Sequence, residues 1–420
     1  MIKVSIIIPV YNDEEYLKEC LNSVCAQTLK EKEIVCINDG STDGSLSILE
    51  NYAESYDNIV VISQANLGVG SARNVGINAA RGDFIAFMDA DDYYPSEDVL
   101  ECLYRNAIAK GVLICGGSYT QDRGGDIIEQ FPGVIKDQKF DKDSKVKFAD
   151  YAFPLGFYRF IFQRKMLLEN SVEFPRYKYY EDPVFLVRAM ANVDEFYAVS
   201  KSVYRHRVGI HQKIFSEERI IEILSASKEM LEIATQIRSK NLQIMLLRLM
   251  REGYYSYICN YVIKKNKDVI KIFKDMLEAV ERCYFVDEME LFKSFQMENM
   301  QVYVKMINQN ILELNEVVKR YSDIIIYGAG VGGKTVKKYL KKVLDVDIRS
   351  FAVTSMNGNE RSIEGVMVAR IDTLLEFKED GLFIIAVAER YRREIEEILY
   401  RQEMKHVYYV DYKWLELIGA

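Results

Sequence analysis

Histidine and paired cysteine are scarce in this chain. Its 420 residues include three histidines, and its seven cysteines form no Cys-x-x-Cys motif, so a zinc site is not expected. The cysteines are odd in number and scattered, mostly within apolar patterns. This distribution suits reduced thiols in the cytoplasm better than a disulfide framework.

Long apolar runs and an excess of basic residues are also absent. No stretch approaches the roughly 18 apolar residues of a membrane span, and Met1–Val10 reads as a first strand because it lacks a signal-peptide cleavage site. A net charge of −8 argues against nucleic acid as a partner. We expect a cytoplasmic protein. Peripheral attachment to the inner face of the cell membrane, through the lysine-rich stretch 264–274, is a minority alternative.

Apolar runs alternate with helical patterns in the first hundred residues. Such Val- and Ile-rich strands between helices predict a parallel sheet covered on both faces. A helix is expected over Asp13–Gln27, with Asn12 as its N-cap. The strands expected are Val4–Pro9, Glu33–Asn38, Ile59–Ser63 and Asp83–Met88.

The remainder of the chain divides into two further parts. From about Ser216 to Tyr321 the apolar spacing is helical throughout. The last hundred residues return to strand–helix alternation and predict a small, doubly wound α/β domain. We therefore expect three parts, at residues 1–215, 216–320 and 321–420.

Three carboxylates follow the fourth expected strand within four residues. Asp89, Asp91 and Asp92 repel one another, so the cluster is costly unless a cation neutralises it. Oxygen ligands favour Mg²⁺ or Mn²⁺, whose coordination shells water and phosphate oxygens usually complete. Asn12 and Asp39 also follow strands, and the carboxyl ends of parallel strands share one crevice. The sequence thus predicts a nucleotide site there, whereas an isolated Asp-x-Asp would more often be a solvated turn.

Five motifs together resemble glycosyltransferase family 2, whose enzymes have the GT-A fold. The likeness covers roughly residues 1–212, and the order and spacing of the motifs make it specific. The motifs are Ser5-Ile6-Ile7-Ile8-Pro9-Val10-Tyr11-Asn12, Asn38-Asp39-Gly40-Ser41-Thr42-Asp43, Asn66-Leu67-Gly68 with Ala72-Arg73-Asn74, Asp89-Ala90-Asp91-Asp92, and Glu181-Asp182.

The resemblance implies a binding site for a nucleotide-sugar donor. Asp39 resembles the carboxylate that accepts from a base N–H, which suits uracil, and Arg73 the cation near the base. Asp91 resembles the direct ligand of Mn²⁺ or Mg²⁺, and Asp89 a carboxylate shared between metal and ribose, with Asp92 in support. Arg205 and Arg207 resemble a basic lid over the diphosphate, although a solvent-facing loop is equally expected. The donor-binding residues expected are Pro9, Tyr11, Asn12, Asp39, Arg73, Asp89, Arg205 and Arg207.

The resemblance also implies a catalytic base at Glu181-Asp182. Asp182 is the expected base for the acceptor hydroxyl, with Glu181 turned away or hydrogen-bonded to the acceptor. An isolated Glu-Asp pair usually lies on the protein surface and has no functional role, so this assignment rests on the family pattern. One base and no carboxylate nucleophile imply a single displacement that inverts the anomeric carbon.

A glycine-rich motif opens the C-terminal α/β segment. Gly328, Gly330 and Gly333 follow a strand and precede a helix, the context of a phosphate-binding loop. The second strand of this segment ends at Ala352–Ser355 without the acidic residue of a dinucleotide site, which disfavours nicotinamide chemistry. A structural role and a second nucleotide site both stay open, with the structural role ahead.

We therefore expect an inverting, metal-dependent glycosyltransferase. It would move a sugar from a UDP-sugar to a saccharide or polyprenyl-linked saccharide acceptor, in surface polysaccharide or glycoconjugate synthesis. A sugar nucleotidyltransferase is an alternative, but it would need an arginine-bearing glycine loop where Pro9-Val10-Tyr11-Asn12 stands. A non-catalytic scaffold that binds nucleotide sugars is the second alternative. The sequence predicts neither the donor sugar nor the oligomeric state.

Overall fold

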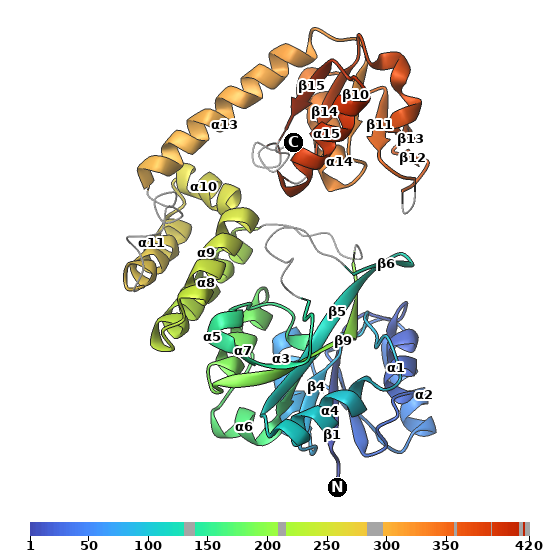
Figure 1. The fold of residues 1–420 in the computed structure, drawn as a ribbon, viewed down its shortest axis with the longest axis vertical. Coiled ribbons are helices and arrows are strands. Elements are labelled where there is room, and N and C mark those ends of the chain that lie inside the picture. The colour runs from blue at the N-terminus through green and yellow to red at the C-terminus, as the bar shows by residue number, and fades with distance from the viewer. Residues whose placement is uncertain are drawn as a thin grey trace. The chain divides into compact units, whose positions relative to one another are not determined.

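The computed structural model describes residues 1–129, 139–208, 216–283, 297–356, 359–387, 389–410 and 415. The chain forms two compact units (Figure 1). The first unit comprises Met1–Gly253 with Lys267–Phe292, and the second comprises Tyr254–Asn266 with Lys293–Ala420. The helical segment that the sequence presents as one part is therefore shared between both units.

The sheet of the first unit is mixed rather than wholly parallel. Its described strands run in the order β3-β2-β1-β4-β8-β5-β9-β7, with β6 paired to β5. The four expected strands are confirmed as parallel neighbours, but β8 runs antiparallel to both β4 and β5. The strands are β1 (Val4–Val10), β2 (Lys32–Asn38), β3 (Ile59–Ser63), β4 (Phe84–Phe87), β5 (Ile114–Arg123), β6 (Asp126–Ile128), β7 (Ser144–Lys147), β8 (Phe160–Gln163) and β9 (Glu195–Arg207).

Amphipathic helices cover this sheet. In α1 the buried residues Leu17, Cys20, Leu21 and Val24 follow helical spacing and pack into the core. All seven residues of β1 are buried, as expected for a central strand with both faces covered. The helical elements are α1 (Leu17–Cys25), α2 (Ser45–Ser55), α3 (Val69–Ala79), α4 (Val99–Lys110), α5 (Phe148–Tyr151), the 3₁₀ turn η2 (Phe157–Arg159), α6 (Arg164–Glu169) and α7 (Glu181–Met190).

The expected N-cap at Asn12 is wrong. Helix α1 begins at Leu17, and Asn12 has a left-handed backbone with φ of 56°. Its side-chain oxygen accepts instead from the backbone N–H of Thr42 at 2.8 Å. The side chain therefore joins two loops rather than starting a helix.

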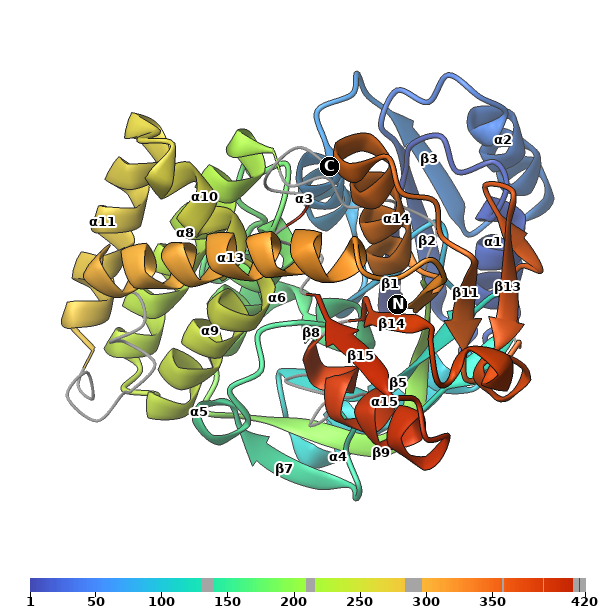
Figure 2. The ribbon, with the colours of Figure 1, turned by 90° about the horizontal axis from the view of Figure 1, so that it is seen from above.

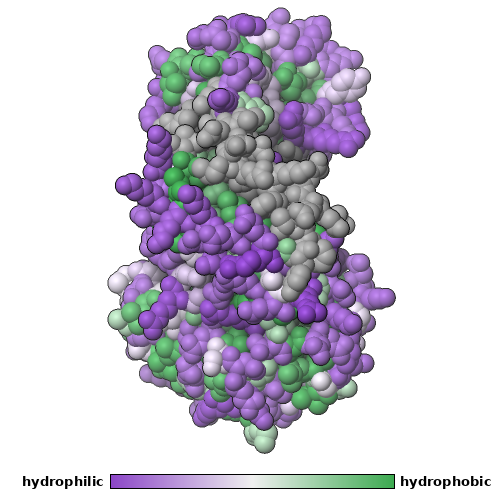
Figure 3. All heavy atoms as spheres, turned by 90° about the vertical axis from the view of Figure 1, so that its left-hand side faces the viewer, coloured by the Kyte–Doolittle hydropathy of each residue, from purple (hydrophilic) through white to green (hydrophobic). Residues whose placement is uncertain are grey.

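Three long helices of the first unit form a group in which the first packs against both of the others (Figures 1 and 2). They are α8 (Glu217–Gln236), α9 (Lys240–Gly253) and α11 (Lys267–Glu281). Helix α8 also packs against α7. Searched over the described ranges, no helix is both long and apolar enough to span a membrane. The face drawn in Figure 3 is mainly hydrophilic, with apolar residues in separate patches.

The second unit contains a doubly wound sheet, which confirms the expected α/β segment. Its strand order is β12-β13-β11-β10-β14-β15, and all pairs except β12–β13 are parallel. The strands are β10 (Ile324–Tyr327), β11 (Ser350–Val353), β12 (Ser362–Ile363), β13 (Val366–Arg370), β14 (Leu382–Ile385) and β15 (His406–Tyr409). The helices are α10 (Tyr255–Ile263), α13 (Met297–Val318), α14 (Val331–Leu344) and α15 (Glu389–Arg401), with 3₁₀ turns η4 (Ile371–Thr373) and η5 (Leu375–Phe377).

Candidate active site

The loops after β1, β2 and β4 meet at the carboxyl edge of the first sheet. Asp39 N–H donates to the carbonyl of Val10 at 2.9 Å, and Met88 N–H to that of Ile7 at 3.0 Å. Asn12 connects the first two loops through Thr42. Because parallel strands end at the same edge, residues far apart in sequence lie along one edge of the sheet. The expected convergence is confirmed.

Asp39 organises the loop that enters helix α3. One carboxylate oxygen accepts from Gln64 Nε2 at 2.7 Å and from Leu67 N–H at 2.9 Å. The other accepts from Gly68 N–H at 2.9 Å. A carboxylate offers about four lone-pair sites, so three internal bonds leave room for one further donor. Asp39 is buried, whereas Leu67 and Tyr11 beside this edge are 68% and 47% exposed.

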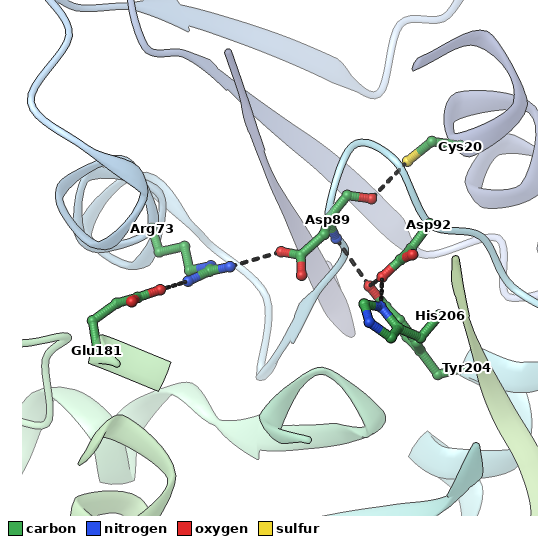
Figure 4. Close-up of polar contacts among 7 residues, drawn as sticks. All are labelled: Cys20, Arg73, Asp89, Asp92, Glu181, Tyr204 and His206. Atoms are coloured by element: carbon green, nitrogen blue, oxygen red, sulfur yellow. Dashed lines mark hydrogen bonds and ion pairs between the residues drawn. The ribbon is translucent and has the colours of Figure 1, made fainter. Parts of the chain in front are cut away.

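Asp92 anchors the acidic turn after β4 to strand β9. Its buried carboxylate accepts from Tyr204 Oη at 2.8 Å and pairs with His206 Nδ1 at 3.0 Å (Figure 4). It also accepts from the backbone N–H of Arg207 at 2.6 Å. Tyr204 Oη also accepts from Asp89 N–H at 3.1 Å. These contacts join the turn to β9, and the supporting role expected for Asp92 in the donor site stays a prediction.

His206 carries a positive charge more readily than a free imidazole. Burial alone would lower its pKa, but the hydrogen bond and charge of Asp92 outweigh burial and raise it. Burial in turn raises the pKa of Asp92, and the hydrogen bond from His206 opposes that effect. The Asp92–His206 pair thus joins the acidic turn to β9, and the positive charge of His206 offsets the negative charge of Asp92.

Asp91 fits a hard cation. Burial, and then the charges of Asp92, Asp89 and Asp13, raise the pKa of its carboxyl to about 7. A site with this excess of negative charge and oxygen donors suits Mg²⁺ or Mn²⁺. Within the ranges that the structure describes, no three His, Cys, Asp or Glu side chains gather as a metal cage.

Arg73 lies between two carboxylates. Its guanidinium donates to Asp89 Oδ1 at 2.7 Å and to Glu181 Oε1 at 2.8 Å (Figure 4). Its side chain is buried and lies over the rings of Phe157 and Phe174, at 4.7 and 5.1 Å from their centroids. Both ion pairs hold the guanidinium between the two acids, and the expected contact of Arg73 with a nucleobase stays a prediction.

Glu181 and Asp182 occupy the first turn of α7, after a residue with a left-handed backbone, Tyr180 (φ 69°). Glu181 is buried against Arg73, as a residue turned away from the acceptor would be. Asp182 keeps partial access to solvent. Burial, and then the charge of Glu181, raise the pKa of Asp182 to about 7, while Arg73 opposes the shift. This shift makes Asp182 more basic than an ordinary carboxylate, and its role as the base stays a prediction.

Arg205 and Arg207 lie on strand β9 rather than on a loop. Arg205 Nε donates to Thr120 Oγ1 at 3.3 Å. Arg207 donates to the carbonyl of Asp91 at 2.8 Å and to Glu19 at 2.7 Å. The continuation of the expected lid, residues 209–215, lies outside the described residues.

The glycine-rich motif of the second unit forms a tight turn between β10 and α14. A Cβ at Gly333 would lie 1.8 Å from the carbonyl oxygen of Gly328, so only glycine allows this helix to approach the strand end. A Cβ at Gly330 would meet nothing within 4 Å. Gly333 therefore has a packing role, and a second nucleotide site at this turn stays a prediction.

Sequence reasoning missed several residues of the first site. Phe157 and Phe174 surround Arg73, and Tyr204 carries the hydrogen bonds between Asp89 and Asp92. Aromatic residues are common in cores, so nothing in their local spacing separates them from ordinary packing residues. Their signal lies in contacts that only the folded chain makes.

Comparison with known proteins agrees with this geometry. Residues 5–168 match the family model described as "Glycosyl transferase family 2". The "Poly(ribitol-phosphate) beta-glucosyltransferase" of Bacillus spizizenii is 33% identical over 283 residues, which are 63% of this chain and 42% of that protein. The "Uncharacterized glycosyltransferase EpsJ" of Bacillus subtilis is 34% identical over 209 residues, or 49% of this chain and 60% of that protein. The chain thus spans less than two thirds of the length of these relatives.

A solved structure shares the fold. Described as "S. aureus TarS 1-349 in complex with UDP-GlcNAc", it superposes with a TM-score of 0.60 and 22% identity, covering 72% of this chain and 89% of that chain. Together with the mixed sheet and its converging loops, this likeness supports the expected GT-A fold. The matched part of the chain, residues 5–168, therefore belongs to glycosyl transferase family 2.

Proposed function

We propose that the protein transfers a sugar from a nucleoside diphosphate, a UDP-sugar, to an acceptor hydroxyl. The observation that carries the proposal is the bridge of Arg73 to Asp89 and Glu181. It unites the acidic turn expected to hold the diphosphate with the pair expected to hold the base. The domain's family and the UDP-GlcNAc bound to its structural neighbour support the same reading.

The donor lies along the carboxyl edge of β1 and β2. Asp39 has one lone-pair site left for a base N–H, which uracil offers and which orients the base. Tyr11 borders the base and ribose from the end of β1, where Asn12 fixes the loop. Pro9 is buried within β1, so it would shape this edge from beneath.

The diphosphate lies at the acidic turn. Asp91, together with Asp89, would hold Mn²⁺ or Mg²⁺, and the ion supplies positive charge against the negative charge that grows on the leaving diphosphate. Asp92, fixed by Tyr204 and His206, keeps this turn in one conformation.

Asp182 accepts the proton of the attacking hydroxyl. Its carboxyl, with a pKa of about 7, is largely ionised at slightly alkaline pH and basic enough to take the proton as the new glycosidic bond forms. Glu181 is held by Arg73 and is therefore unavailable as a nucleophile. One displacement by the acceptor oxygen follows, and it inverts the anomeric carbon.

Surface polysaccharide or glycoconjugate synthesis is the setting that fits the relatives' names. A relative named for poly(ribitol-phosphate) glucosylation supports a saccharide or polyol acceptor. We place the reaction in the cytoplasm, where nucleotide sugars are made, with acceptor chains carried by a polyprenyl lipid at the inner membrane face.

A panel of nucleotide sugars tests the proposal. Purified protein is incubated with each donor and Mn²⁺, and release of the nucleoside diphosphate is measured. We expect release from at least one UDP-sugar, stimulated by a saccharide acceptor. Tight donor binding without release from any donor would favour the non-catalytic scaffold instead.

A further inference from the structure

The segment from Phe174 to Tyr179, just before the catalytic pair, is held by side-chain hydrogen bonds at both of its ends. Each set of hydrogen bonds is called a clamp below. At Phe174, the side chain of Asn74 on α3 donates to the backbone carbonyl at 2.9 Å and accepts from the backbone N–H at 2.9 Å. Asn74 belongs to the motif that carries Arg73, so the first clamp comes from the family domain itself. The second clamp comes from outside residues 5–168.

Glu222 of helix α8 makes the second clamp. Its carboxylate accepts from the backbone N–H of Tyr179 at 2.8 Å and from that of Lys178 at 3.1 and 3.2 Å. Two successive N–H groups aimed at one carboxylate form a charge-assisted pair that fixes backbone direction as well as position. The next residues in the chain are Tyr180, Glu181 and Asp182.

The position of the clamp matters because Tyr180 is strained. A left-handed backbone at a bulky residue costs free energy and persists only where neighbours impose it. The bend at Tyr180 turns the chain into α7 and so sets the direction of Asp182. Releasing Lys178 and Tyr179 would let Tyr180 relax and move the base.

Helix α8 holds the far side of this segment as well. Glu229, seven residues beyond Glu222 and thus on the same helical face, pairs with Arg188 of α7 at 2.6 Å. Arg188 in turn donates to the carbonyl of Glu173 at 2.8 Å. The helix therefore supports both the approach to the catalytic pair and the helix that carries it.

We propose that Glu222 is a positioning residue for the catalytic base, so that α8 is a working part of the active site. The proposal rests on the function proposed above, in which Asp182 is the base. Glu222 accepts from two backbone N–H groups, and the proposal gives it no contact with substrate. Its loss should therefore slow the chemical step while leaving the donor site, built by Asp39 and Asp91, intact.

Substitutions at two acidic residues of α8 test this role. Glu222→Ala removes the acceptor, whereas Glu222→Gln keeps one oxygen that can accept from both N–H groups. Glu218→Gln is the matched control, since Glu218 is exposed on the same helix.

We expect Glu222→Ala to lower kcat by at least about tenfold through misplacement of the base. The KM for donor and the Kd for UDP should change by less than about twofold, because the donor contacts remain. Glu222→Gln should recover most of kcat, and Glu218→Gln should match the wild type.

Amide hydrogen exchange gives a readout that needs no activity. In Glu222→Ala the amides of Lys178 and Tyr179 should exchange at least about tenfold faster than in the wild type, with Glu218→Gln unchanged. The positioning role is overturned if Glu222→Ala keeps the wild-type kcat. It is also overturned if both Glu222 variants lose kcat and UDP binding to the same extent. Faster exchange in Glu222→Ala combined with no transfer by the wild type would contradict the proposed function while leaving the clamp itself intact.

Discussion

Arg73 donates to Glu181 at 2.8 Å across 108 residues of sequence. The same guanidinium reaches Asp89, so one buried cation serves the acidic turn after β4 and the first turn of α7. This bridge explains why the neighbouring residues Glu181 and Asp182 differ in ion pairing and solvent access. Glu181 is ion-paired with Arg73, whereas Asp182 keeps partial solvent access and a raised pKa.

Removal of Arg73 should destabilise the first unit. In Arg73→Met the carboxylates of Glu181 and Asp89, with side chains 9% and 25% exposed, lose their cation. Breaking a buried pair in this way costs about 3 kcal/mol of unfolding free energy. Arg105→Met is the control, because Arg105 is 75% exposed beside Glu101, and a loss below about 0.5 kcal/mol is expected there. Urea unfolding measures both, and equal losses would contradict a special role for the bridge.

The rate of transfer should rise with pH up to about neutrality. Asp182 must be ionised to accept a proton, and its pKa is raised to about 7, so acid below that value protonates and inactivates the base. A profile of kcat between pH 5 and 9 should rise, reach half of its maximum near pH 7 and level off above about pH 8. Glu181→Gln should move the rise to lower pH, because the charge of Glu181 helps to raise the pKa of Asp182. A profile that is flat or falls between pH 5 and 7 would contradict Asp182 as the base.

Substitution of Asp91 should raise the Mn²⁺ concentration that the enzyme needs for activity. Asp91→Asn removes the expected ligand, so half-maximal activity should require at least about tenfold more Mn²⁺, and calorimetry with Mn²⁺ and UDP should show weaker binding. Asp57→Asn, at an exposed position, should behave as the wild type. Full activity of the wild type after exhaustive chelation would contradict the metal assignment.

Two glycines of the second unit should respond differently to alanine. Gly333→Ala forces a Cβ to within 1.8 Å of the Gly328 carbonyl oxygen and should cost about 2 kcal/mol or more. Gly330→Ala meets open space and should stay within about 0.5 kcal/mol of the wild type. Calorimetric unfolding temperatures check both, and equal stability of the two variants would show that α14 does not pack as described.

Much of the fold could be predicted because the relevant signals are local. Strands β1 to β4 are apolar runs bounded by polar turns, and they fall within a few residues of the expected bounds. Strand β9 (Glu195–Arg207) was not predicted, since polar residues such as Ser200, Lys201 and Ser202 interrupt it. Its pairing with β5 and β7 depends on tertiary contacts rather than on its own pattern.

The site was predictable as a list of residues but not as a set of contacts. The carboxylates Asp39, Asp89 and Asp91 follow strands, so their shared edge follows from parallel pairing. The bridge of Arg73 and the clamp by Glu222 do not, because each joins segments whose approach depends on packing. A close approach at Gly70, whose added Cβ would lie 3.3 Å from Glu181 Cγ, is one example of that packing.

The most direct test of the account compares the wild type with Asp182→Asn under the same Mn²⁺ and donor conditions. Asparagine keeps the shape of the side chain but cannot accept the proton at neutral pH, and loss of a general base lowers kcat by about 10²- to 10⁴-fold. We predict that Asp182→Asn binds UDP-sugar with wild-type affinity, measured by calorimetry, and loses transfer, measured by UDP release. Transfer at the wild-type rate would contradict the account and move the base elsewhere, with Glu181 as the first alternative.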